Sequence, residues 1–187
     1  MGATSRPVRA PVSARGSRPL IEALGALRAA LLEVGAPHML IGGTAVILRG
    51  VARVTDDVDA TVWAEDVSIE TLLAVFARHE IEGRIVDVAE FARDRQVVLL
   101  RHRPSGTSID VSLAWLPFER EALDRAETLD VEGVPIPVAR VQDLIVYKAV
   151  AWRDRDRADI ERLARTHRDE IDFREVCRIV GDRKSVV

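Results

Sequence analysis

Residues 41–62 read IGGTAVILRGVARVTDDVDATV and bring a glycine turn close to a pair of aspartates. Residues 38–41, His-Met-Leu-Ile, predict a short buried strand, Gly42-Gly43 predicts a turn, and residues 44–49 predict a helix. A turn between a buried strand and a helix presents free backbone N–H groups, and glycine lets a phosphate approach them closely. The stretch therefore predicts a phosphate-binding turn, with the hydroxyl of Thr44 as a further donor.

The aspartates lie at the start of a second predicted strand, residues 58–63. Side chains two residues apart on a strand point to the same face, so Asp57 and Asp59 share a face while Asp56 points away. Carboxylate oxygens are the ligands that hard cations such as Mg²⁺ prefer. The pair therefore predicts a divalent metal site beside the glycine turn.

A third carboxylate, Asp110, lies in the middle of a later β-rich segment. Residues 96–102 and 107–114 predict the two strands of a hairpin, with its turn at Pro104-Ser105-Gly106. An unpaired charge in a buried strand is costly, so Asp110 needs a partner. A metal ion shared with the aspartate pair would supply that partner.

Three carboxylates can hold two Mg²⁺ ions, with Mn²⁺ as a substitute, and such ions bind a nucleoside triphosphate (NTP). They also orient the attacking oxygen and neutralise charge on the leaving pyrophosphate. We expect Asp57 and Asp59 to be metal ligands, and Asp110 to be a ligand or the base toward an incoming hydroxyl.

The order of the predicted elements favours an α/β (α+β) fold with a mixed sheet and flanking helices, followed by a helical C-terminal subregion. Strand patterns are concentrated before residue 140 and helical patterns after it. Ser68 is expected to cap a helix in the first part. We expect three regions: a disordered basic arm at 1–18, a nucleotide-binding core at 19–139, and helices at 140–187 packed on that core.

Composition limits the classes of function. The formal net charge is −3, but residues 1–18 carry four arginines and no acid, which leaves −7 on the rest. An acidic body argues against broad electrostatic capture of nucleic acid, although the arm or a local groove can still contact phosphates. Cys177 is the only cysteine, so no intramolecular disulfide forms and a reducing cytoplasmic location is expected, with the thiol buried. No apolar run is long enough to span a membrane.

The Ile-Gly-Gly turn, the Asp-Val-Asp pair and the later strand-borne Asp110 together resemble the DNA polymerase β-like nucleotidyltransferase superfamily. The resemblance covers roughly residues 20–165. Within the superfamily, residues 41–62 are similar to the minimal branch of abortive-infection Eii-type (AbiEii) toxins, in which an Arg-x-Thr-x-Asp-x-Asp string is common. Arg53 begins that string here. The resemblance implies an NTP-dependent transferase with a nucleotidyltransferase-like core.

The later segment VQDLIVYKAVAWRDRDRADIERL, residues 141–163, also resembles this branch. By position, the resemblance implies that Lys148 and Asp159 lie near the nucleotide. Each has a simpler alternative: Lys148 can extend along the surface with its ammonium in water, and Asp159 can pair with Arg155 or Arg162 on its own helix. Arg53 can likewise meet a phosphate or form an ion pair with Asp57.

The acceptor of the transferred nucleotide stays open. The toxin branch implies RNA, such as the end of a tRNA, and a possible antitoxin partner. Small aminoglycoside-modifying nucleotidyltransferases share the same core motifs, so a small molecule is the alternative. A module that binds nucleotides or a partner without catalysis is a third possibility, because intact carboxylates do not establish turnover.

Overall fold

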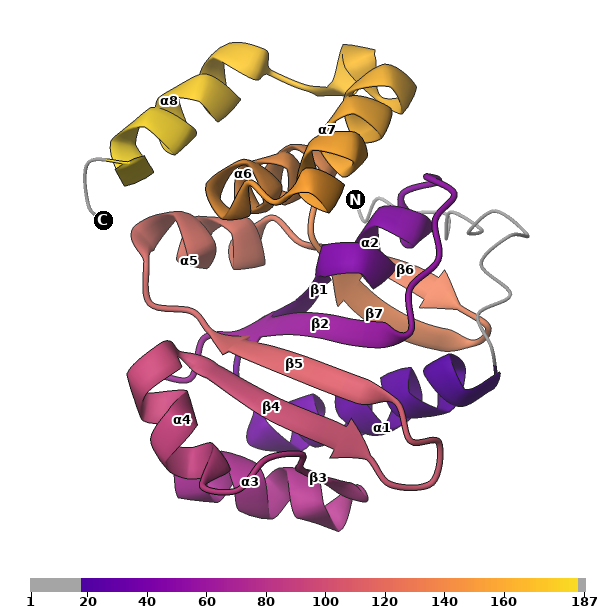
Figure 1. The fold of residues 1–187 in the computed structure, drawn as a ribbon, viewed down its shortest axis with the longest axis vertical. Helices are drawn as coiled ribbons and strands as arrows, with labels where there is room; N and C mark the ends of the chain where they lie inside the picture. Colours follow the sequence, from indigo (N-terminus) through magenta and orange to yellow (C-terminus); the bar gives the residue numbers. More distant parts are fainter. Residues whose placement is uncertain (1–17, 185–187) are drawn as a thin grey trace, which may run out of the picture.

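The computed structural model describes residues 18–184 of the chain. The arm predicted at 1–18 lies outside the described residues, apart from Arg18, which begins the first helix. A short 3-10 turn at Arg168–Glu170 precedes the last helix. The helices and strands (Figure 1) are α1 (Arg18–Val34), β1 (His38–Ile41), α2 (Gly42–Leu48), β2 (Asp57–Val62), α3 (Ile69–Arg78), β3 (Ile81–Gly83), α4 (Val88–Arg95), β4 (Val97–His102), β5 (Ser108–Leu113), α5 (Pro117–Asp124), β6 (Glu127–Val131), β7 (Val134–Val138), α6 (Val141–Ala151), α7 (Asp154–Thr166) and α8 (Phe173–Lys184).

The strands form one seven-stranded sheet in the order β3-β4-β5-β2-β1-β7-β6. β2 runs parallel to β5 and β1 runs parallel to β7, whereas the other neighbouring strands are antiparallel. The predicted hairpin of β4 and β5 joins the sheet by pairing β5 with β2. The prediction of a mixed sheet flanked by helices is therefore confirmed.

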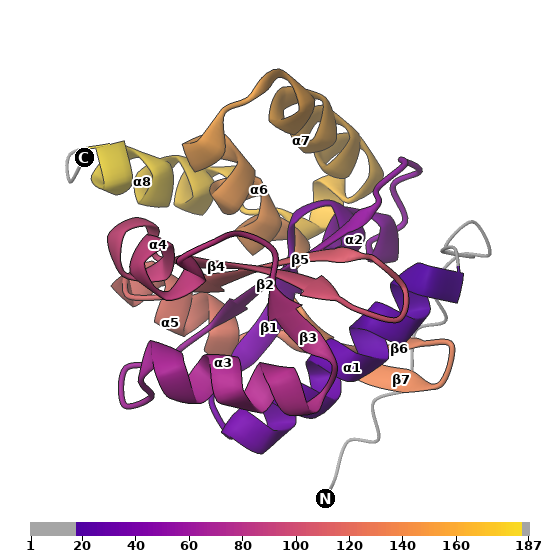
Figure 2. The ribbon, with the colours of Figure 1, turned by 60° about the horizontal axis from the view of Figure 1, so that its bottom comes forward.

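Helices cover both faces of the sheet (Figure 2). α1 and α3 lie on one face, whereas α2 and the C-terminal helices α6, α7 and α8 lie over the other. The side chains of β2 alternate accordingly: Val58 and Ala60 are fully buried on the α1 face. Asp57 and Asp59 are half-buried and point to the α2 face. The sequence alternation thus places the carboxylates on the side where α2 begins.

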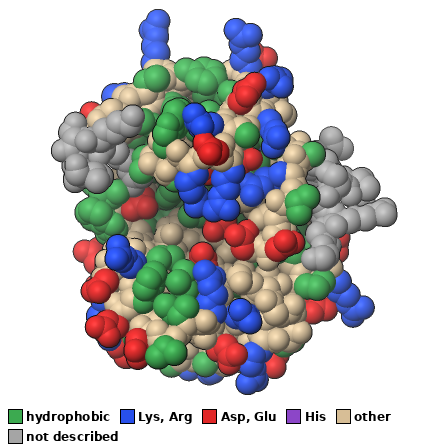
Figure 3. Space-filling model, in the orientation of Figure 1, with side chains coloured by type: hydrophobic (Ala, Val, Ile, Leu, Met, Phe, Trp, Pro, Cys, Tyr) green, Lys and Arg blue, Asp and Glu red, His purple; other side chains and the backbone are tan. Residues whose placement is uncertain are grey.

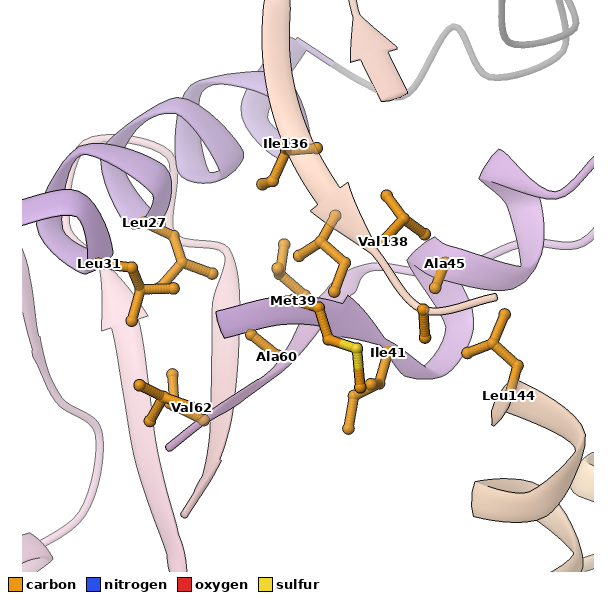
Figure 4. Close-up of a cluster of buried hydrophobic side chains, with 14 of the residues drawn as sticks. Leu27, Leu31, Met39, Ile41, Ala45, Ala60, Val62, Ile136, Val138 and Leu144 are labelled. Carbon is orange, nitrogen blue, oxygen red and sulfur yellow. The ribbon is translucent and has the colours of Figure 1, made fainter. Parts of the chain in front are cut away.

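A continuous apolar core holds these layers together. Leu27 and Leu31 of α1 lie near Val62, while Leu144 of α6 lies near Ala45 of α2 (Figure 4). Complete burial of one such leucine contributes about 1.5–3 kcal/mol. Apolar packing on both faces therefore fixes the sheet between its helices and holds α2 against α6.

Several local predictions can be compared directly with the structure. Ser68 caps α3, because its Oγ accepts a hydrogen bond of 3.1 Å from the N–H of Thr71, as predicted. β3 and α4 were not predicted: β3 has only three residues, and α4 is mostly polar and follows Asp87 in a left-handed conformation. Cys177 is exposed, so the prediction of a buried thiol is wrong. Within residues 18–184, no helix has the length and apolar character needed to cross a membrane.

Candidate active site

The three predicted carboxylates lie on one face of the sheet. Asp59 on β2 stands directly opposite Asp110 on the parallel strand β5, and opposite Ile41 on the antiparallel strand β1. Asp57 lies one strand repeat before Asp59 and is half-buried like it. Because opposed residues of neighbouring strands point to the same side, the sheet register brings these carboxylates to the face of α2.

The glycine pair contacts Asp59 directly. α2 begins at Gly42, immediately after β1, and Gly42 has a φ of +63°. The N–H of Gly43 donates a hydrogen bond of 3.2 Å to Oδ2 of Asp59. A Cβ atom on Gly42 would lie only 1.9 Å from that same oxygen. The glycines were predicted to face a phosphate, and this stays a prediction. In the structure, Gly42 leaves room for the Asp59 side chain, and the N–H of Gly43 orients it.

Two threonines fix the other carboxylate. Thr44 is buried, and its hydroxyl donates a hydrogen bond of 2.9 Å to the backbone oxygen of Asp57. Thr55 donates from its hydroxyl to Oδ1 of Asp57 at 2.5 Å. The hydroxyl of Thr44 therefore helps to hold the strand that carries the aspartate pair, and its role as a donor to a phosphate stays a prediction.

The electrostatics of the pair favour a cation. Burial is the largest cause that raises the pKa of Asp59 above its usual value of 3.8, and the charges of Asp57 and Asp110 add to it. The hydrogen bond from Gly43 and the charge of Lys148 act in the opposite direction. Carboxylate oxygens that repel each other on one face suit a hard divalent cation, whose charge would relieve the repulsion.

Asp110 is held separately by Arg84, the residue that follows β3. Nη1 of Arg84 contacts Oδ1 of Asp110, and Nη2 lies 3.4 Å from Oδ2. Among the residues that the structure describes, no group of three or more His, Cys, Asp or Glu side chains is gathered closely enough to hold a metal ion. The described site thus presents Asp57 and Asp59 as a pair, with Asp110 beside them and paired to an arginine.

A buried ion network joins the aspartate face to α6 and α7. Lys148 is 5% exposed, and its Nζ lies 2.7 Å from Oδ2 of Asp159 and 3.3 Å from Oδ1 of Asp156. Nη1 of Arg53 reaches the same Oδ2 of Asp159 at 2.6 Å. Nε of Arg153 lies 2.7 Å from Oδ2 of Asp156.

These contacts exclude the simpler alternatives for Lys148, Asp159 and Arg53, whose roles near a nucleotide stay predictions. Lys148 is not a surface lysine, because its ammonium is buried between two aspartates. Asp159 pairs with Lys148 and Arg53 rather than with its helical neighbours Arg155 or Arg162. Arg53 forms its ion pair with Asp159 and not with Asp57.

Arg153 borders the site from the helical side. Its pKa is raised above the usual arginine value, first by its hydrogen bond to Asp156 and further by the charges of Asp59 and Asp57. Its side chain is 58% exposed, so the guanidinium is open to solvent. Figure 3 looks onto this face and shows basic and acidic side chains gathered around a hollow between the sheet and the C-terminal helices.

The sequence reasoning missed Arg84, Arg153 and Asp156 as parts of this site. Asp156 lies three residues before Asp159 on α7, a spacing that puts both on one side of a helix, so this signal was available. Arg84 had no such signal, because it lies next to a three-residue strand that its own sequence does not predict.

The contact between Gly42 and Asp59 leads to a first prediction. Gly42→Ala is expected to lower the free energy of unfolding by about 2 kcal/mol or more, since a left-handed alanine costs about 1–2 kcal/mol and Asp59 must also move. Gly50→Ala is the matched control, because Gly50 also has a positive φ (+85°) and no atom lies within 4 Å of its added Cβ. Urea denaturation measures both variants. Equal losses would show that the contact with Asp59 costs nothing.

Comparisons with known proteins agree with this fold. Residues 21–187 match the model of a family described as "Nucleotidyltransferase of unknown function (DUF6036)". No protein with a curated description matches the sequence. The structure is similar to the solution structure of the antibiotic-resistance factor ANT(2'')-Ia, with 18% identity, a TM-score of 0.57, and 89% of this chain and 91% of that chain covered.

A crystal structure of ANT(2'')-Ia in complex with adenylyl-2''-tobramycin is also similar (18% identity, TM-score 0.56, 89% of this chain and 98% of that chain). So is an antigenic nucleotidyltransferase-like protein from Paracoccidioides brasiliensis (17% identity, TM-score 0.53, 76% of this chain and 74% of that chain). At these identities the likeness concerns the fold, and the narrower resemblance to AbiEii toxins stays a prediction. Because the family model spans most of the sequence, the chain belongs to the DUF6036 family of nucleotidyltransferases.

Proposed function

We propose that this protein transfers a nucleoside monophosphate from an NTP to an acceptor hydroxyl and releases pyrophosphate. The observation that carries the proposal is the arrangement of Asp57 and Asp59, two half-buried carboxylates on one face of β2, one of which is hydrogen-bonded to the glycine pair. Membership of a nucleotidyltransferase family and the likeness to nucleotidyltransferase structures support it.

Mg²⁺ fits the aspartate pair, because the donors are carboxylate oxygens. Burial is the largest cause that raises the pKa of Asp59, and repulsion from the charge of Asp57 is the second, so a cation bound between them would relieve this repulsion. Asp57 and Asp59 would hold the ion. When bound, Mg²⁺ supplies positive charge that stabilises the triphosphate and the leaving pyrophosphate. The hydrogen bonds from Gly43 to Asp59 and from Thr55 to Asp57 keep the two carboxylates oriented for this task.

Asp110 is the group that we assign to proton transfer. It stands opposite Asp59 in the register, and 31% of its side chain is exposed, so an acceptor hydroxyl can reach it. A carboxylate within hydrogen-bond reach of the attacking hydroxyl can accept its proton. Holding the hydroxyl and the triphosphate on one face of the sheet would provide the alignment on which such transfers depend.

We assign Arg153, which precedes α7, to contact with the triphosphate. Lys148 would assist by holding Asp156, the carboxylate that Arg153 also contacts. Arg153→Ala is expected to raise the KM for NTP by about tenfold with a small effect on kcat, since a charge-assisted hydrogen bond contributes about 1.5 kcal/mol. Arg157→Ala is the control, because Arg157 is exposed and pairs with the exposed Asp154. Steady-state kinetics measure both variants, and an unchanged KM for Arg153→Ala would contradict the assignment.

RNA is the first acceptor to test, because Arg153 lies within range of the charges of Asp57 and Asp59, and the exposed Arg155 and Arg157 follow it at the start of α7. An antitoxin partner belongs to the same proposal, by the resemblance to AbiEii toxins. Tobramycin is the second acceptor to test, because ANT(2'')-Ia is seen in complex with adenylyl-2''-tobramycin.

The test is to incubate the wild type with each α-labelled NTP, MgCl₂, and either total RNA or tobramycin, beside Asp57→Ala/Asp59→Ala. Label on an acceptor with the wild type alone supports the proposal and names the acceptor. No labelled acceptor, together with a melting temperature that NTP and Mg²⁺ leave unchanged, would contradict the proposal and favour a module that binds a partner rather than a nucleotide.

A further inference from the structure

We propose that Arg84 is a positioning residue that competes with a divalent cation for Asp110, so that the resting site offers a metal two free carboxylates rather than three. This inference rests on the proposed function, because it concerns the same metal site. It assigns a role to a residue that the sequence motifs do not include.

Arg84 and Asp110 form a close ion pair. Both terminal nitrogens of Arg84 face the two carboxylate oxygens of Asp110, one in close contact and the other at 3.4 Å. This is the two-pronged arrangement with which a guanidinium recognises a carboxylate. The guanidinium neutralises much of the charge of this carboxylate, so a metal ion binds it more weakly until the arginine moves away.

The sheet register places Asp110 beside the aspartate pair. It lies directly opposite Asp59 across the β2–β5 pairing, which makes it the nearest strand neighbour of the aspartate pair on that side. Its charge already raises the pKa of Asp59. Arg84 reaches Asp110 from the side of β3 and β4, whereas Asp59 lies on the β2 side of Asp110. Arg84 and a cation bound by Asp59 would therefore compete for the same carboxylate, and their positive charges would repel each other.

Release of Asp110 requires movement of the Arg84 side chain only. The backbone N–H of Arg84 donates a hydrogen bond of 3.0 Å to the oxygen of Leu99, which continues the pairing of β3 with β4. The Arg84 and Asp110 side chains are 22% and 31% exposed, so water and ions can reach both. The guanidinium can swing away from Asp110 while its Cα stays in the sheet, and the triphosphate of the NTP is an anion in the same site that can receive it.

The test measures Mn²⁺ binding by electron paramagnetic resonance, without NTP, so the readout does not depend on activity. Arg84→Gln is expected to bind Mn²⁺ about tenfold more tightly than the wild type, because one positive charge leaves and one carboxylate is released. Arg84→Lys keeps the positive charge but cannot contact both oxygens of Asp110 as a guanidinium does, so it should give an intermediate affinity for Mn²⁺. Arg103→Gln is the control, since it removes an exposed arginine that follows β4 and lies 3.9 Å from Glu80.

Asp110→Asn completes a double-mutant cycle. If Arg84 acts through Asp110, adding Arg84→Gln to Asp110→Asn should change Mn²⁺ affinity much less than Arg84→Gln does alone. Equal affinity of the wild type and Arg84→Gln, with binding that is lost in Asp57→Ala/Asp59→Ala, would overturn the inference and leave the proposed function standing. Absence of Mn²⁺ binding in both the wild type and Arg84→Gln would overturn the inference together with the metal site. Thermal melting of each variant confirms that it is folded.

Discussion

Asp59→Asn is expected to reduce nucleotidyl transfer by about 10³-fold, because it removes a metal ligand and with it several kcal/mol of charge stabilisation. The side chain keeps its shape and can still accept the hydrogen bond from Gly43, so the site remains assembled. Asp56→Asn is the matched control, since Asp56 is exposed and lies outside the pair. Its activity should equal that of the wild type.

The same variant has a defined effect on stability. Burial first, and the charge of Asp57 second, raise the pKa of Asp59 above its usual value of 3.8. As pH rises above that value, the unfolded chain releases the proton before the folded chain does, so the wild type loses stability until the folded pKa is passed. Asp59→Asn cannot ionise there, and its free energy of unfolding should exceed that of the wild type at pH 7 but not at pH 3.

Equilibrium denaturation across this pH range, run beside the transfer assay, checks both statements. If Asp59→Asn is less stable than the wild type at pH 7, the surroundings stabilise the ionised form of Asp59. That result would contradict the raised pKa. A variant with more than a tenth of the wild-type activity would remove Asp59 from the metal site.

Lys148→Met is expected to lower the free energy of unfolding by about 3 kcal/mol, because it leaves two buried carboxylates without their shared ammonium. Asp156 and Asp159 are 1% and 2% exposed, so water cannot replace the lost charge. This loss of stability lies at the low end of the range of about 3–5 kcal/mol for a broken buried ion pair. The reason is that Arg153 still contacts Asp156 and Arg53 still contacts Asp159. Transfer activity should fall as well, because α6 and α7 would lose their fixed position over the aspartate face.

Arg165→Ala is the control for this prediction. Arg165 forms an exposed ion pair with Glu161 on the same helix as the two aspartates, and such pairs contribute at most about 1 kcal/mol. Urea unfolding of Lys148→Met, Arg165→Ala and the wild type gives the comparison. A loss below 1 kcal/mol for Lys148→Met would show that the network is not a source of stability.

Local sequence patterns were enough to predict the elements that carry the aspartates. Alternation predicted β2 and β5, and the glycines marked the boundary between β1 and α2, although α2 begins at Gly42 rather than two residues later. The pairing of β2 with β5 could not be predicted, because nothing local to Asp59 or Asp110 specifies that they stand opposite each other. Their roles as metal ligands stay predictions.

The partners of these residues depend on distant parts of the chain. Arg53 reaches Asp159 across 106 positions, and Thr44 bonds the backbone of Asp57 across 13. Arg84 holds Asp110 from a region where β3 is short and α4 is polar, so neither the strand nor the contact has a sequence signal. The periodicity of the sequence indicates which face of the sheet or helix a side chain lies on. Which residue it contacts there depends on how the elements pack together.

The most direct test of the central claim uses NTPs that are radiolabelled on either the α- or the γ-phosphate, and follows where each label goes. With Mg²⁺ and the acceptor identified by screening, the wild type should place the α-label on the acceptor and release the γ-label as pyrophosphate, while Asp59→Asn should do both about 10³-fold more slowly. A γ-label on the acceptor, or release of γ-label as inorganic phosphate with no α-label transferred, would contradict nucleotidyl transfer at the Asp57 and Asp59 pair.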